Sequence, residues 1–221
     1  MSTLNYRLVV NAGQLLLIDA AVSDPHVTDV LNSLLYAQLA ASFEGPRFID
    51  EPRWSAREYE AQKSFGWSFP VESSDVAITQ SSRLNVASML ANALPSLKGQ
   101  AEQERLHARL DRLDRTTPGM ELLAASTCLQ KSAKTSAQVF CTLVVVSPGP
   151  VLEIASVSFG TGQALPDLWS GYFDSRQVQG KVKLAMRVGR LQEMVYASMR
   201  DTFTVALKDD IPTHVFNLDK A

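Results

Sequence analysis

The chain has 221 residues, of which 46% are hydrophobic and 20% charged, with 21 Lys and Arg against 23 Asp and Glu. This is an ordinary globular composition, and the length is sufficient for one sizeable core. The start shows no basic region before an apolar run, and the apolar stretch Leu8 to Val22 is interrupted by polar residues and too short to cross a bilayer, so we expect a cytoplasmic protein with no membrane partner.

The first elements are a hairpin and a long helix. Two apolar runs, Tyr6–Val10 and Leu15–Ala21, flank a short turn that contains a glycine, which is the pattern of a β-hairpin. Asp24 then offers an N-cap and Pro25 suits the first helical position. Apolar residues follow at helical spacing up to the Gly-Pro pair at residues 45–46, which predicts an amphipathic helix.

The segment between residues 44 and 115 alternates loops and short helices. Residues 44–54 are predicted to be a loop, and the Ser55 to Glu58 spacing predicts a capping box that opens a helix ending near Ser64. The aromatic stretch 65–70 is predicted to be a loop packed on the core, followed by a short strand around Val76 and Ile78. Further helices are expected over residues 84–94 and over the charged stretch 100–115.

The last hundred residues are rich in strand-like runs. We expect strands at Met120–Gln130, Gln138–Ser147 and Val151–Gly160, a basic strand after residue 175, a helix over Arg190–Thr202, and a terminal pair of strands around residues 203–207 and 215–218. A hairpin that turns near Lys134 would place Cys128 opposite Cys141, and we expect both to be free, buried thiols.

These elements predict an α+β fold. We expect a largely antiparallel sheet of about six to eight strands with amphipathic helices packed on one face. The chain is interpreted as a single domain over residues 1–221; the alternative is two lobes, a helix-rich half at 1–117 and a strand-rich half at 118–221.

The clearest functional signal is a basic strand. Between Ser175 and Gln192 the chain holds five basic residues and no acid, so a patch of positive charge lies on an otherwise acidic chain. Three of the five alternate with apolar residues, which places them on one face of a half-buried strand. The predicted binding residues are Arg176, Lys181, Lys183, Arg187 and Arg190.

Aromatic residues precede this strand. Trp169 and Tyr172 lie a few residues before Arg176 and are candidates for stacking on the bases of single-stranded nucleic acid beside the positive strand. The alternative is that the aromatic residues anchor a loop on the core while the basic side chains are simply solvated.

No motif identifies a catalytic centre. The three histidines, His26, His107 and His214, are far apart in sequence, and the glycine pair Gly160 and Gly162 lacks the third glycine or the Lys of a phosphate-binding loop, so a bend with positive φ is the simpler interpretation. The catalytic residues are therefore unknown, and neither a metal site nor a cofactor is expected.

Three hypotheses remain. The first is a non-catalytic binding or assembly protein that acts through a sheet edge and the basic strand, on a protein partner or on its own copy as a homo-oligomer. The second is a nucleic-acid-binding accessory protein that uses the same strand. The third is an enzyme with a dispersed active site, involving His26 or the Gly160 loop, which requires a pocket with a second titratable residue.

Overall fold

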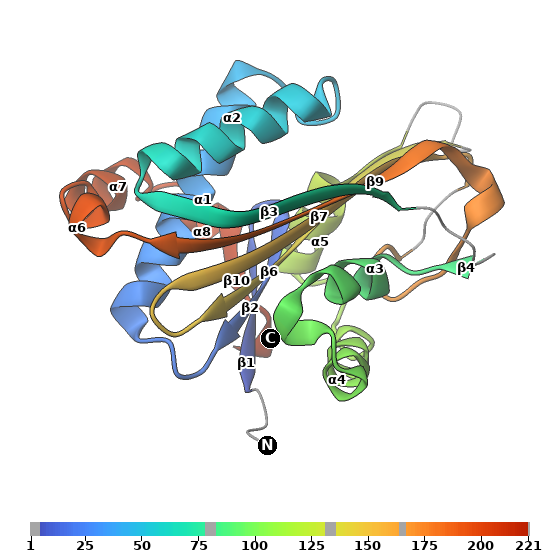
Figure 1. The fold of residues 1–221 in the computed structure, drawn as a ribbon, viewed down its shortest axis with the longest axis horizontal. Helices are drawn as coiled ribbons and strands as arrows, with labels where there is room; N and C mark the ends of the chain where they lie inside the picture. Colours follow the sequence, from blue (N-terminus) through green and yellow to red (C-terminus); the bar gives the residue numbers. More distant parts are fainter. Residues whose placement is uncertain (1–4, 78–82, 131–135, 164–166, 221) are drawn as a thin grey trace.

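A computed structural model describes residues 5–77, 83–130, 136–163 and 167–220. Within these ranges, an eight-stranded sheet has the strand order β10-β1-β2-β6-β7-β9-β3, and β5 pairs with β6 at one end (Figure 1). Every neighbouring pair is antiparallel except β2 with β6. The strands of this sheet are β1 (Tyr6–Asn11), β2 (Gln14–Asp19), β3 (Trp67–Ala77), β5 (Cys128–Gln130), β6 (Ala137–Ser147), β7 (Val151–Thr161), β9 (Val178–Leu191) and β10 (Val215–Asn217). The short strands β4 (Arg83–Leu84) and β8 (Phe173–Asp174) form a separate pair.

Helices cover both faces of the sheet. The described helices are α1 (Asp24–Glu44), α2 (Glu51–Ser64), α3 (Val86–Ala93), α4 (Gln100–Leu110), α5 (Pro118–Thr127), α6 (Glu193–Ala197), α7 (Arg200–Ala206) and α8 (Ile211–His214). Short 3-10 turns occupy Pro95–Leu97, Ser175–Gln177 and Leu218–Lys220. In Figure 1, α2 lies on one side of the sheet, and α3 and α4 lie on the other. No helix within the described ranges is both long and apolar enough to span a bilayer.

The predicted α+β class and largely antiparallel sheet are confirmed, but the helices were expected on only one face. The central strands β2 and β6 are buried on both faces, as their almost unbroken apolar sequences require. One face packs against α1, α6 and α7 through residues such as Leu34 and Phe203, and the other packs against α3, α4 and α5 through residues such as Leu90 and Leu123. Each face of the sheet therefore has its own apolar core.

The first hairpin has the predicted position and a tight turn. Asn11 pairs with Gln14, which leaves Ala12 and Gly13 in the turn, and Ala12 has a φ of 49°. The side-chain carbonyl of Gln38 in α1 accepts a hydrogen bond of 3.0 Å from the Gly13 amide, so the helix that follows the hairpin also holds its turn. The terminal strand β10 pairs with β1 and not with residues 203–207 as expected.

Three segments before residue 130 differ from the sequence predictions. Residues 118–127 form helix α5 where a strand was expected, because Pro118 occupies the first turn of a helix that buries Met120 and Leu123 at i, i+3 spacing. Residues 67–77 form an eleven-residue strand where a loop was expected over its first part; Ile78 lies outside the described residues. Helix α2 begins at Glu51, with the Asp50 carboxylate capping the Arg53 amide, so Ser55 lies inside the helix and makes no capping box.

The two cysteines are free thiols in neighbouring strands. Cys128 pairs with Val139 and not with Cys141, so the register differs by two residues from the predicted one; the turn expected near Lys134 lies outside the described residues. Burial raises the pKa of the Cys141 thiol to about 12 and also raises that of Cys128. Both thiols are therefore protonated and weakly nucleophilic at neutral pH.

Candidate functional site

A cleft of about 610 Å³ lies between α2 and the sheet, and the basic strand β9 lines it. Three basic side chains of β9 face this cleft, as the alternating sequence predicts. Serines of β7 and β3, acids of α2 and β3, and apolar side chains such as Phe140 and Met186 complete the lining. The polar lining residues are Glu51, Ser55, Glu58, Glu72, Ser73, Ser74, Ser156, Ser158, Lys181, Lys183 and Arg187.

The inner face of α2 supplies much of the polar part of this cleft. Glu51, Ser55, Glu58 and Gln62 follow one another at i, i+4, i+7 and i+11, which aligns them on one side of the helix. Of the helix residues, Trp54, Glu58 and Gln62 are buried, so most of the side that faces the sheet is hydrophilic. This helix therefore contacts the sheet both through its acidic side chains and through aromatic rings, such as Trp54 with its centroid 5.9 Å from that of Phe140.

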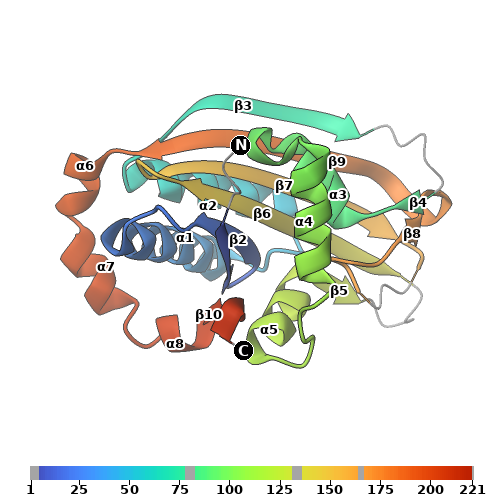
Figure 2. The ribbon, with the colours of Figure 1, turned by 90° about the horizontal axis from the view of Figure 1, so that it is seen from below.

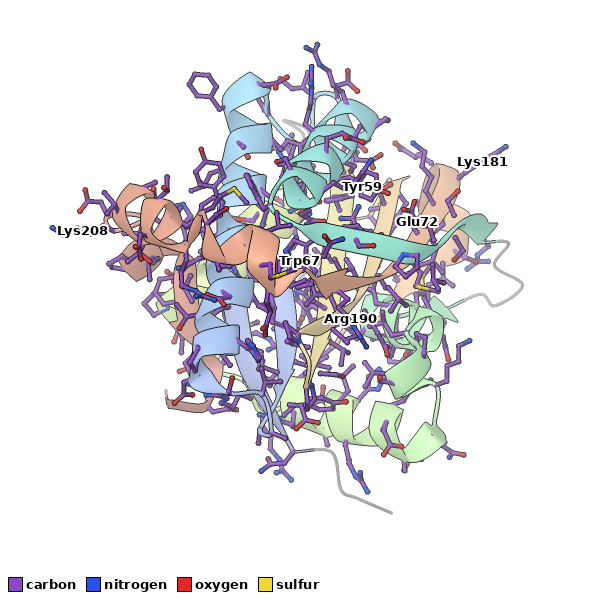
Figure 3. All side chains as sticks on the ribbon, turned by 60° about the vertical axis from the view of Figure 1, so that its left-hand side comes forward. Tyr59, Trp67, Glu72, Lys181, Arg190 and Lys208 are labelled. Carbon is purple, nitrogen blue, oxygen red and sulfur yellow. The ribbon has the colours of Figure 1, made fainter. Side chains whose placement is uncertain are left out.

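At the outer part of the cleft, the Glu51 carboxylate faces the basic strand. The Lys183 ammonium and the Ser158 hydroxyl both lie 3.4 Å from Glu51 Oε2, and the Lys183 side chain is 60% exposed. Lys181, at the end of β9 labelled in Figure 3, is exposed and has no ion pair within the described residues. Lys181 and Lys183 are thus accessible cations, and the contact of Lys183 with Glu51 is at the long end of the hydrogen-bond range.

Deeper in the cleft, Arg187 belongs to a buried network. Its guanidinium lies 3.4 Å from the Glu58 carboxylate, and Gln14 Nε2 donates to the same carboxylate at 2.6 Å. The rings of Tyr59 and Phe69 each lie 5.3 Å from the guanidinium carbon, as in a cation–π contact. Because Glu58 and Gln14 are buried, we interpret Arg187 as a residue that attaches α2 to the sheet.

The other two predicted basic residues lie outside the cleft. Arg176 is paired with Asp174 at 2.7 Å, and this hydrogen bond raises the pKa of Arg176. Arg190 is exposed and, three positions from Arg187, lies by alternation on the opposite face of the sheet. The five basic residues therefore do not form one continuous surface.

The two candidate stacking residues differ in exposure. The Trp169 side chain is 3% exposed and belongs to the core on the α3 and α4 face, which leaves no ring surface for a nucleic-acid base. Tyr172 is 59% exposed, and the Arg83 guanidinium lies 5.2 Å from its ring centroid. Burial thus leaves Tyr172 as the accessible member of the pair.

The sheet ends next to the cleft in a long edge strand. β3 pairs with β9 on one side, and no described strand pairs with its other side; Figure 2 shows it along the outer edge of the sheet. Its pairing shifts between Ser68 and Val71, around Pro70, and Val71 to Ser74 are exposed. The sequence predicted the basic strand but not the position of the edge, and in the structure the two are hydrogen-bonded neighbours.

The site also contains a buried cation that the sequence analysis missed. Arg47 is 9% exposed, and its guanidinium carbon lies 3.8 Å from the Phe140 ring centroid and 4.5 Å from that of Trp54. It donates hydrogen bonds to the carbonyls of Gly13 and Ser126 at 3.4 and 3.2 Å. Burial lowers the pKa of Arg47 to about 10, with the Glu58 carboxylate acting in the opposite direction. No motif signalled it, because a single Arg in a Pro-flanked loop carries no periodicity.

The residues considered for catalysis are dispersed. His26 lies against Glu193, and His107 hydrogen-bonds Ser88 at 3.0 Å. Gly160 lies inside β7 and has no positive φ, contrary to the predicted bend, and it lines a smaller neighbouring pocket together with Glu51. Within the described ranges, no group of three or more His, Cys, Asp or Glu residues could hold a metal ion.

Comparisons with known proteins give only remote structural similarity. No protein-family model matches the chain, and no curated protein matches it. Among solved structures, a delta-endotoxin is similar with a TM-score of 0.44 and 9% identity over 81% of both chains. The Evf virulence factor has a TM-score of 0.40 and 6% identity over 100% of this chain and 86% of its own. The activated Cyt2Ba monomer from Bacillus thuringiensis subsp. israelensis has a TM-score of 0.37 and 11% identity over 81% of this chain and 98% of its own. Similarity at this level carries no argument about what this chain does.

Proposed function

We propose that this chain is a non-catalytic binding protein that takes up an extended, acidic segment of a protein partner. The segment adds as a strand to the free edge of β3, and its acidic side chains are directed to Lys181 and Lys183. The observation that carries the proposal is that an unpaired edge strand lies directly beside the strand with two accessible cations.

The edge can accept another strand. Unpaired N–H and C=O groups along an edge supply main-chain hydrogen bonds, and side chains that alternate along the added strand supply specificity. From Val71 to Ala77 the strand has no proline. On the cleft face, Ser74 pairs with Ala185, so two small side chains lie between the Glu72–Arg187 pair and Lys183.

The charges on β3 favour a different partner over a second copy of the chain. If β3 paired antiparallel with its own copy about Glu72, the Glu72 carboxylates of the two copies would lie opposite each other, and like charges directly opposite each other destabilise a sheet. An acidic partner segment gains instead from Lys181 and Lys183. A homo-oligomer is therefore the less favoured form of the same proposal.

The first prediction concerns a fluorescein-labelled peptide of alternating glutamate and valine. It should bind the chain with an affinity that falls as salt rises, because the Lys181 and Lys183 contacts are exposed to solvent. Lys181→Glu should weaken binding about tenfold, whereas Lys208→Glu, which makes the same charge change on the far side of the molecule (Figure 3), should not. Fluorescence anisotropy measures both.

Two further probes make this experiment decisive. A peptide of alternating glutamate and proline has the same charges but cannot pair as a strand; equal binding of that peptide would contradict strand addition. Oligothymidylate tests the nucleic-acid hypothesis; if it bound and the glutamate–valine peptide did not, the basic strand would be assigned to nucleic acid. A molecular mass in solution larger than that of one chain, which falls to that of one chain in a Val71→Glu variant, would instead support self-assembly at the same edge.

Glu51 is expected to act as an internal competitor for the acidic segment. Its carboxylate lies 3.4 Å from the Lys183 ammonium, where an acidic side chain of the partner would bind. Glu51→Gln should therefore raise the affinity for the glutamate–valine peptide about two- to fivefold, the amount that one exposed ion pair accounts for. Glu60→Gln, on the exposed part of the same helix, is the matched control. Equal gains in both variants would indicate a general effect of net charge and contradict this role.

A further inference from the structure

A second groove lies on the opposite face of the sheet, between α4 and the first two strands. It has a volume of about 670 Å³, within the range of about 300–1,000 Å³ that small-molecule sites occupy. Leu17, Leu97 and Leu106 give it apolar walls, and Tyr6 also lines it. Its residues are separate from the α2 cleft and from the β3 edge.

Three arginines of α4 and the turn after it line this groove. Arg105, Arg109 and Arg112 follow at i, i+4 and i+7, and Asp111 between them keeps helical backbone angles, so the three lie along one side. They outnumber the acids in this part of the lining, Glu102 and Asp219.

These arginines have different roles. Arg109 donates to the Tyr6 carbonyl and to the Asp219 carboxylate, so it links the helix to both ends of the described chain. Arg105 is half exposed, and its one ion pair among the described residues is with Glu102 of the same helix, at 3.1 Å. Arg112 is exposed, and its guanidinium has neither a hydrogen bond nor an ion pair within the described residues. Arg105 and Arg112 are therefore available to a ligand, while Arg109 is structural.

We propose that this groove binds a small, soluble organic anion in which a phosphate or carboxylate group is joined to an apolar body. The planar guanidinium matches the oxygens of phosphate and carboxylate, and the leucines bury the apolar part of the molecule. The Tyr6 pKa is raised to about 12, chiefly by burial, so its hydroxyl remains a proton donor at neutral pH. The helix dipole favours a basic residue in the last turn, which accounts for the position of Arg109. Arg105 lies in the middle of the helix, beside the apolar wall of the groove, so the dipole does not account for its position.

The test uses 1-naphthyl phosphate, with 1-naphthol and inorganic phosphate as the two halves of the same molecule. Calorimetric titration should show binding of 1-naphthyl phosphate at least about tenfold tighter than either half, because the charged and apolar contacts add. Arg105→Ala and Arg112→Ala should each weaken it about tenfold. Arg53→Ala, an exposed arginine on α2 across the sheet, is the matched control and should bind as the unmodified chain does.

Three results would overturn the proposal. The first is 1-naphthol binding as tightly as its phosphate, which would leave no role for the arginines. The second is unchanged binding in the variant that lacks both Arg105 and Arg112 while its thermal unfolding is unaltered. The third concerns lipid head groups, which present the same oxyanion. The chain would then sediment with vesicles of equimolar phosphatidylcholine and phosphatidic acid, only when both arginines are present, and would not bind 1-naphthyl phosphate. That result would assign the site to a lipid surface.

Discussion

Replacing Glu58 by alanine is expected to destabilise the fold by about 3 kcal/mol, because it removes one partner of a buried ion pair. The Glu58 side chain is 5% exposed and the Arg187 side chain 18% exposed. Without the carboxylate, the Arg187 guanidinium loses its ion-pair partner, and Gln14 Nε2 loses its acceptor. Urea unfolding followed by tryptophan fluorescence measures the change in the free energy of unfolding.

Two variants distinguish the buried pair from an ordinary surface contact. Glu60→Ala, whose side chain is 62% exposed and pairs with Lys63, should change stability by less than about 0.5 kcal/mol. Adding Arg187→Met to Glu58→Ala should restore part of the lost stability, because an apolar side chain of similar length then replaces the unpaired charge. If Glu58→Ala were no worse than Glu60→Ala, the interpretation of α2 as a helix anchored by charge would be wrong.

The sequence predicted well those elements whose residue pattern fits either a helix or a strand but not both. The hairpin of β1 and β2 and the helix α1 have a turn, a cap and a continuous period, and each forms within a few residues of its expected position. The alternation of charged and apolar residues in β9 correctly placed Lys183 and Arg187 on one face.

Short apolar patterns with two interpretations were the source of error. Phe203, Val205 and Leu207 alternate as in a strand, but Phe203 and Leu207 are also four residues apart, as on a helix. In the structure these two are buried and Val205 is 76% exposed, which is the helical pattern. Tertiary contacts with α1, through the Tyr36 ring 5.0 Å from Phe203, decide between the two.

The candidate site was only half visible in the sequence because its acidic half comes from a different segment. Asp50 and Glu51 precede a proline, which resembles a solvated turn, yet Asp50 caps α2 and Glu51 faces Lys183 across the cleft. Residues 51 and 183 are far apart in the chain and become neighbours through the order of the strands in the sheet, which no local sequence pattern specifies. For the same reason the sequence could not show that β3 is an edge or that it lies beside β9.

Replacing Arg47 should separate the effect of its charge from that of its volume. Arg47→Ala should cost about 2–4 kcal/mol, because it leaves a hole between Phe140 and Trp54 and removes the hydrogen bonds that hold the Gly13 turn. Arg47→Met fills most of that space without a charge, so it should change the free energy of unfolding by no more than about 1 kcal/mol. Equal losses in the two variants would show that the charge and its hydrogen bonds, not the packing, stabilise the site.

The pH dependence of the same pair of proteins tests the physical cause. Burial lowers the pKa of Arg47 from its ordinary 12.5 to about 10, so the folded state holds this proton less tightly than the unfolded chain does. The buried charge therefore opposes folding at every pH below about 10, and this cost falls as the pH rises from that value toward 12.5. The unmodified chain should thus gain stability relative to Arg47→Met as the pH rises from about 10 to about 12. A difference between the two proteins that stays constant over this range would mean that Arg47 is as well solvated in the folded protein as in the unfolded chain.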